Sequence, residues 1–209
     1  MENDKSAEIK EKLSIKYMKN EIILKCSDVR SAEIKMNQFI ECFENYIGKN
    51  FPSDYERAAF NTFTVVLFDG PLLLYAIGMN TSAIMELHSI LERFSLREVS
   101  KILAKPSQEF VVKKTLERYT LPGLAKILHN DLDILDDKDV NYAKSLNKLR
   151  NGIAHRNERV ISNALCSSRT ISLLDIDHEV NKIDIKPHLL CGIVFLYKLF
   201  NRKSIGSNR

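Results

Sequence analysis

The sequence has few of the residues that interrupt helices and few that build metal or redox sites. It holds seven glycines and five prolines in 209 residues, so it offers little punctuation for turns and tight loops. Its four cysteines are widely scattered and form no C-x-x-C pair, which excludes the usual zinc and thiol-disulfide motifs. We therefore expect reduced thiols, no metal, no cofactor and a cytoplasmic protein.

Long uninterrupted hydrophobic runs are also absent. The longest apolar stretch, residues 63–79, carries Asp69, Gly70 and Pro71 in its middle, which favours a buried core segment with a turn or kink over a membrane span. The N-terminus has no apolar run behind a basic start, as a secretory signal would have. We therefore expect a soluble protein with no membrane partner.

Neither sign of charge dominates the composition. The 31 Lys and Arg residues face 27 Asp and Glu residues, for a net charge of +4, which excludes the massed basic composition of a histone-like nucleic-acid binder. A hydrophobic content of 44% excludes an intrinsically disordered chain. Any affinity for phosphate must therefore come from the placement of the cations.

Apolar residues recur at three- and four-residue spacing through most of the chain, which predicts an all-α fold. A capping-box pattern at Ser95 and Glu98 predicts a new helix or a bend there. Two β-branched stretches, 170–176 and 180–185, favour a small β-hairpin or extended loops before the last helix. The other helices are expected at 31–48, 54–67, 72–77, 82–94, 108–119, 120–129, 140–159 and 187–200.

The length favours one domain with an appendage. The charge-rich residues 1–28 are expected to form an N-terminal appendage, residues 29–203 a single α-helical domain, and residues 204–209 a tail.

The segment 140–159 carries the residues that point to a chemical function. Successive side chains on a helix turn by about 100°, which separates an apolar face from a polar one. The apolar stripe is expected at Tyr142, Leu146, Leu149, Ile153 and Val160, and the opposite face at Lys144, Lys148, Asn151, His155 and Arg159. His155 should then point away from the core, and a solvated face without function is the alternative interpretation.

These residue types suit the handling of an RNA phosphate. The imidazole of His155 could take a proton from a ribose 2′-hydroxyl or deliver one to a leaving 5′-oxygen. The planar guanidinium of Arg150 could hold a phosphate and stabilise the extra charge of the transition state. Asn151 could orient either partner, and a basic track for backbone phosphates would comprise Lys144, Lys148, Arg156 and Arg159.

Arg150 and His155 are five positions apart, so on a regular helix their directions differ by about 140°. Three arrangements would bring them to one phosphate. The long side chain of Arg150 could reach round the helix, or Gly152 could loosen the helix near its end. Alternatively, two copies of the helix could meet across a homodimer interface, so that one chain supplies the arginine and the other the histidine.

Residues 149–155, LRNGIAH, resemble the signature of the HEPN superfamily, in which an Arg, often followed by Asn, precedes a His by four to six residues. The resemblance implies a helical bundle with the motif on a late helix, and dimers that join two motifs. In active members it implies metal-independent RNA cleavage, with Arg150 and His155 as the catalytic pair and Asn151 beside them. It further implies a toxin–antitoxin or antiviral setting, with an antitoxin or regulatory protein as a possible partner.

One position departs from a subtype of this family. HEPN toxins that a nucleotidyltransferase antitoxin silences carry Tyr two residues after the His, where this chain has Asn157, which argues against that mode of control. The superfamily also contains members that bind nucleic acid, nucleotide or proteins without catalysis, so a non-catalytic module is the alternative. A third interpretation is an all-α regulatory protein in which Arg150 only pairs with an acidic residue of its own chain.

Glu86 and His88, on the helix expected at 82–94, could line the same cleft as a second acid–base group, with a polar helix edge as the alternative. His129 falls at an expected helix end, where a cation suits the negative end of the dipole. The acidic cluster at 175–179 matches no metal-ligand spacing and is expected to be a surface loop.

Overall fold

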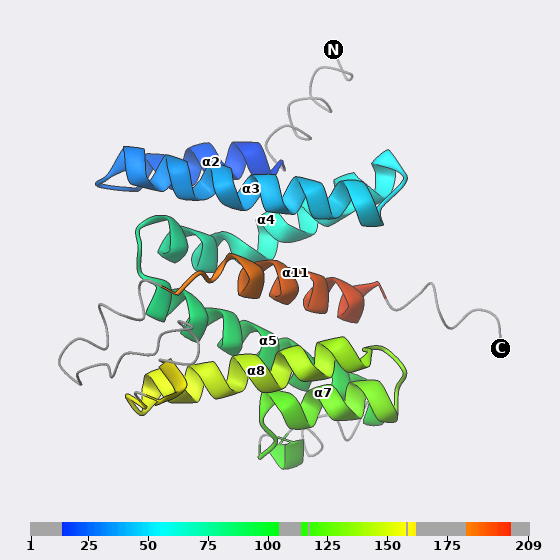
Figure 1. The fold of residues 1–209 in the computed structure, drawn as a ribbon. Coiled ribbons are helices and arrows are strands. Elements are labelled where there is room, and N and C mark those ends of the chain that lie inside the picture. Colours follow the sequence, from blue (N-terminus) through cyan, green and yellow to red (C-terminus); the bar gives the residue numbers. More distant parts are fainter. Residues whose placement is uncertain (1–13, 105–113, 117, 158, 162–182, 202–209) are drawn as a thin grey trace.

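The computed structural model describes residues 14–104, 114–116, 118–157, 159–161 and 183–201. Within them the fold is all-α, as the sequence predicts, and no strand occurs. Most of the segment expected to form a β-hairpin, and most of the helix expected at 108–119, lie outside the described residues. Figure 1 labels the helices α2 (Ile15–Leu24), α3 (Val29–Asn50), α4 (Asp54–Ala76), α5 (Asn80–Leu103), α7 (Leu121–Asn130), α8 (Asp137–Ala154) and α11 (Lys186–Phe200).

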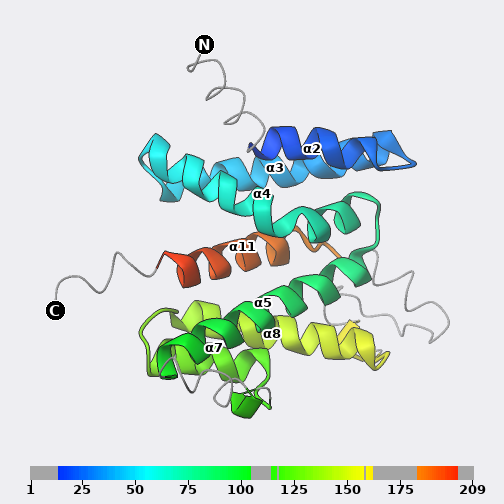
Figure 2. The same ribbon diagram turned by 180° about the vertical axis from the view of Figure 1, so that it is seen from behind.

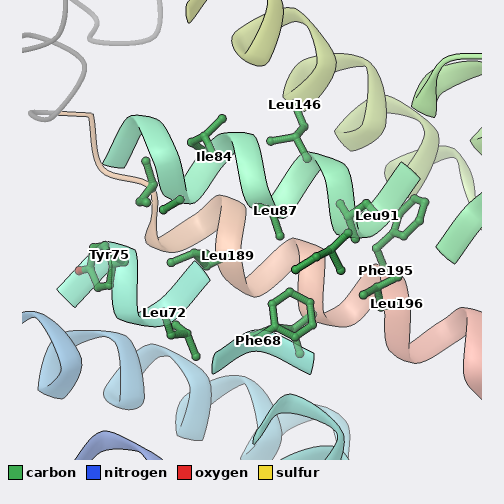
Figure 3. Packing of buried hydrophobic residues seen from close by; sticks show 14 of the residues in the cluster. Phe68, Leu72, Tyr75, Ile84, Leu87, Leu91, Leu146, Leu189, Phe195 and Leu196 are labelled. Carbon is green, nitrogen blue, oxygen red and sulfur yellow. The ribbon is translucent and has the colours of Figure 1, made fainter. Parts of the chain in front are cut away.

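The helix α11 occupies the middle of the bundle. Figures 1 and 2 show α2, α3 and α4 on one side of it and α5, α7 and α8 on the other. It contacts α3, α4, α5 and α8. In Figure 3, Leu189 of α11 lies near Leu87 of α5, and Phe195 of α11 lies near Leu91 of α5, all wholly buried. This burial of apolar area joins the two halves of the bundle across α11.

Most helices begin where local sequence signals place them. Ser53 and Glu56 form a reciprocal capping box at the start of α4, which satisfies two backbone N–H groups that a helix start leaves unpaired. Asp136 and Asp139 do the same for α8. The helix α7 begins with Pro122 in its first turn, where proline costs no hydrogen bond.

Two predicted interruptions do not break the helices. The helix α4 continues through Pro71, so the separate helix expected at 72–77 is wrong; Figure 2 shows α4 changing direction along its length, the kink that an internal proline causes. The helix α5 continues through Ser95, where the capping-box pattern predicted a new helix or a bend. Buried side chains on both sides, Leu91 and Val99, keep that segment helical.

The expected boundary at residue 28 is wrong for the part of the appendage that the structure describes. Helix α2 contributes Ile15, Met18 and Ile22 to the main core, each at most 4% exposed, and it packs against α3 and α4. The sequence signal is weak because the apolar residues Ile22, Ile23 and Leu24 are consecutive and do not follow helical spacing. Residues 1–13 and the expected tail at 204–209 lie outside the described residues.

By length and composition alone, α4 is the one described helix apolar enough to cross a membrane. A core helix passes the same test, and α4 packs against α2, α3, α5 and α11 through buried residues that include Phe60, Phe68 and Leu72.

Candidate functional site: the end of helix α8

Helix α8 carries the motif and is fixed at both ends. At its start, Lys198 of α11 reaches Asp136 at 3.0 Å and Asp139 at 2.7 Å. Partial burial opposes the charge on Asp136, but hydrogen bonds from the Asp139 backbone and from Lys198 outweigh it and lower its pKa to about 2. Along its length, the predicted stripe is buried at Leu146, Leu149 and Ile153.

The helix ends at Ala154, five residues before the predicted end. His155 is its C-cap, and Arg156 adopts the left-handed backbone conformation, with φ of 49°. The N–H groups of Arg156 and Asn157 donate to the carbonyls of Ile153 (3.1 Å) and Gly152 (2.7 Å). This pattern is a Schellman motif, which closes a helix and turns the chain away from its axis.

The expectation that Arg159 shares a helical face with Lys144 and Lys148 is therefore wrong. After the Schellman turn, residues 159–161 form one further helical turn. Asn157 caps that turn by accepting a hydrogen bond from the N–H of Val160 at 3.2 Å. Gly152 does not loosen α8 either. It lies within the regular helix and makes room for Val160, whose Cγ1 would be 2.5 Å from a Cβ at Gly152.

The guanidinium of Arg150 bends toward the end of the helix. Its Nη1–H donates to Oδ1 of Asn151 at 2.9 Å, and both side chains are half-buried. No carboxylate of the described residues lies within 4.0 Å of Arg150, so the interpretation of this residue as an internal ion-pair partner finds no support there. Asn151 lies one helical turn before His155, which is exposed as predicted.

A second histidine lies beside this group. His88 of α5 is 2% exposed, and its Nε2–H donates to Oδ1 of Asn147 on α8 at 3.0 Å. Burial lowers the pKa of the imidazole and the charge of Arg150 lowers it further, whereas Asn147 and Glu92 oppose the shift. His88 is therefore a neutral side chain at neutral pH.

Glu92 connects α5 to α7 rather than to Arg150. Its Oε1 accepts a hydrogen bond from the N–H of Leu121, the first residue of α7, at 3.1 Å. Its Oε2 lies 4.0 Å from Nδ1 of His88, which is beyond hydrogen-bonding distance. The carboxylate is well placed there, because the start of a helix carries unpaired N–H groups and partial positive charge.

Glu86 does not join this group. Its carboxylate lies over Gly70 of α4, on the side of α5 that faces the other half of the bundle. The prediction of a second acid–base group beside the motif therefore remains possible for His88 alone. His129 lies in the last turn of α7, which ends at Asn130, and its Nδ1–H donates to the carbonyl of Leu135 at 2.8 Å.

The cations of the predicted track are at the surface. Lys144 and Lys148 are exposed on α8, and Arg156 and Arg159 are exposed beyond its end. The described residues contain no group of three or more His, Cys, Asp or Glu side chains placed to hold a metal ion. The cluster expected at 175–179 lies outside the described residues.

The sequence did not single out Asn147 or Glu92. Asn147 precedes Arg150 by three residues and Asn151 by four, so helical spacing alone places all three on one face. That signal could have identified Asn147. The contact with His88 could not be foreseen, because a single sequence does not give the register of two helices.

Comparison with protein-family models, with curated proteins and with solved structures gives no match to this chain. An inference about function therefore depends on the helical fold and on the residues at the end of α8.

Proposed function

We propose that this protein is a metal-independent endoribonuclease of HEPN type, active as a homodimer. The observation that carries the proposal is how the guanidinium of Arg150 is paired and oriented. Its guanidinium is paired with no carboxylate of the described residues, and it bends toward Asn151, one turn before the exposed His155. A guanidinium that can hold a phosphate and an imidazole that can transfer a proton are the two groups that this kind of phosphate-ester cleavage requires.

In the proposed reaction His155 removes the proton from a ribose 2′-hydroxyl, and the 2′-oxygen attacks the adjacent phosphorus. The bond from phosphorus to the 5′-oxygen breaks, and an imidazolium returns a proton to that oxygen. The products are a 2′,3′-cyclic phosphate and a 5′-hydroxyl. Arg150 holds the phosphate and stabilises the added negative charge of the transition state, while Asn151 orients the guanidinium.

The geometry of α8 supports a composite site at a dimer interface. Because α8 is regular through Ala154, the directions of Arg150 and His155 differ by about 140°. Because Arg150 bends toward Asn151, the angle between its side chain and that of His155 is smaller, but the two side chains still point in different directions. A two-fold dimer that opposes the ends of two α8 helices would supply the arginine from one chain and the histidine from the other.

The exposed cations would bind the RNA backbone on either side of the reacting phosphate. Lys144 and Lys148 precede the site along α8, and Arg156 and Arg159 follow it. Each phosphate contact should steepen the salt dependence of binding. A cytoplasmic toxin or antiviral effector, restrained by an antitoxin or regulatory protein, is the setting that we propose for such an enzyme.

The second candidate is a non-catalytic HEPN module that binds RNA, nucleotide or a protein partner through the same face. The separation of Arg150 and His155 on one regular helix favours it, because a single chain then binds phosphate without completing a catalytic pair.

The deciding experiment incubates the purified protein with single-stranded RNA in excess chelator. The wild type is compared with His155→Ala, Arg150→Ala and the control Lys16→Ala, which changes an exposed lysine on α2. We expect cleavage that leaves 2′,3′-cyclic ends and is lost in both motif variants but not in the control. Cleavage that persists in His155→Ala would contradict the proposal. Salt-sensitive binding without cleavage would favour the non-catalytic module.

A further inference from the structure

We propose that His88 is a positioning residue for Arg150, which keeps the guanidinium apart from the carboxylate of Glu92 and so leaves it available to bind phosphate. The inference deepens the proposed function and rests on it where RNA cleavage is concerned. Its structural part, the freedom of Arg150 to bind an anion, can be tested without any enzymatic activity.

The first observation is an ion pair that does not form. Helix α5 packs against α8. His88 of α5 contacts Asn147, one turn before Arg150 on α8, and Oε2 of Glu92 lies 4.0 Å from the other nitrogen of the same ring. An arginine and a carboxylate that are both half-buried attract each other strongly, because solvent screens them less than at the surface. Arg150 nevertheless donates to the neutral Asn151.

The second observation is the way in which His88 is fixed. Its imidazole is 2% exposed, and its bond to Asn147 at 3.0 Å ties it to α8 one turn before Arg150. The opposite ring nitrogen faces Glu92 at 4.0 Å. The ring thus has Glu92 at one nitrogen and Asn147 of α8 at the other. A neutral ring in that position adds no charge that would repel Arg150.

The third observation is that Glu92 already has a partner. The N–H of Leu121 donates to it at 3.1 Å, at the start of α7. The charged groups that act on His88 are therefore Glu92 from its own helix and Arg150 from α8, and the contribution from α7 is a backbone N–H bound to Glu92. Oε1 of Glu92 is bound by that N–H and Oε2 faces His88, so removal of the ring would open the space between Oε2 and α8.

The test compares the wild type with His88→Ala, Glu92→Gln and the double variant. Glu92→Gln keeps an oxygen acceptor for Leu121 and serves as the matched control. The Nε–Hε NMR resonance of Arg150, assigned by its loss in Arg150→Lys, is followed during titration with inorganic phosphate. In His88→Ala we expect the apparent phosphate affinity at Arg150 to fall about tenfold, the effect of one modest ion pair. In the double variant it should return to the value of Glu92→Gln.

An unchanged phosphate response in His88→Ala, or a double variant as weak as His88→Ala, would overturn the inference. If His88→Ala does not fold by circular dichroism, His88→Ser opens the same space and replaces it, with the same expected results. RNA cleavage measured on the same variants should follow the same order. If the wild type does not cleave RNA, the proposed function fails, and the phosphate titration still decides the role of His88.

Discussion

Gly152 sits inside the motif, at the place where the chain folds back onto α8. A Cβ there would lie 2.5 Å from Cγ1 and 2.8 Å from Cβ of Val160. Alanine is otherwise the better helix former, by about 1 kcal/mol. A glycine is therefore needed at this position because Val160 occupies the space that a Cβ would fill. This contact lies at the end of the candidate site.

We predict that Gly152→Ala lowers the free energy of unfolding by about 1–3 kcal/mol, as overpacked substitutions do. The matched control is Gly48→Ala on α3, where nothing lies within 4 Å of an added Cβ, and which should raise stability by about 0.5–1 kcal/mol. Urea unfolding of both variants measures the difference. Equal effects of the same sign would show that contact with Val160 does not set the requirement for glycine.

Arg156 occupies a backbone position that usually belongs to glycine. Its φ of 49° places it in the left-handed region, which costs an L-residue about 1–2 kcal/mol. We predict that Arg156→Gly weakens RNA binding although it relieves this strain. Asp133→Gly, at φ of 51°, relieves similar strain away from the motif and should leave RNA binding unchanged. Filter-binding titrations at several salt concentrations compare the two, and equal affinities would argue against a phosphate contact at Arg156.

The sequence predicts the exposure of His155 correctly, because helical spacing opposes it to the stripe at Leu146 and Leu149. It misplaces Arg159, because the reversal at Arg156 depends on a left-handed residue that no glycine signals. The neighbours of Arg150 were also beyond prediction. His88 of α5 contacts Asn147, one turn before Arg150, and the register between α5 and α8 depends on packing across the whole core.

Among the helices, α2 was predicted to be part of an appendage but packs into the core. Ile22 is 0% exposed, whereas Leu24, two residues later, is 80% exposed. We predict that Ile22→Ala lowers the free energy of unfolding by about 2–4 kcal/mol through the lost transfer energy and the cavity. Leu24→Ala should change it by no more than about 0.5 kcal/mol. Similar losses in thermal or urea unfolding would show that α2 is not part of the cooperative core.

The start of α8 depends on pH through Asp136. Its pKa of about 2, against a usual value of 3.8, means that the native state binds fewer protons than the unfolded state between these values. The stabilisation is thus present above pH 3.8 and is lost as the pH falls toward about 2.

Lys198→Met removes the cation that pairs with Asp136 and should lower the melting temperature at neutral pH. We predict that the difference in melting temperature between the variant and the wild type becomes smaller as the pH falls from 3.8 toward about 2. Lys16→Met, whose ion pair with Glu44 is exposed at both partners, should show little effect at any pH. If the difference in melting temperature between the wild type and Lys198→Met stays constant across this pH range, the pH dependence does not come from the pairing of Lys198 with Asp136.

At the scale of these helices, the sequence predicts the existence of most elements and some of their ends. Ser53 caps α4, Asp136 caps α8 and Pro122 lies in the first turn of α7, and all three are local signals of a helix start. The signals at Ser95 and Pro71 fail, because buried neighbours on both sides continue the helix. Local preference is weaker than the packing of a long apolar face.

For the whole molecule, composition and spacing suffice to predict an all-α fold, but they do not predict which helices touch. The central position of α11 between the two halves brings residues near 190 against residues near 70 and 87 (Figure 3). Such contacts are far apart in sequence and depend on the shapes of all the packed faces. The same limit applies to the dimer, which the proposed site needs in order to join two α8 ends.

The most direct measurement of the central claim is complementation between two inactive variants. Arg150→Ala and His155→Ala are co-expressed at equal levels, and cleavage of single-stranded RNA is measured in excess chelator. Half of the dimers should then carry one intact site, formed by Arg150 of one chain and His155 of the other, so activity should return to about a quarter of the wild-type value. Cleavage by the mixture no greater than that of each variant alone, from chains that fold and dimerise normally, would contradict a composite site at the end of α8.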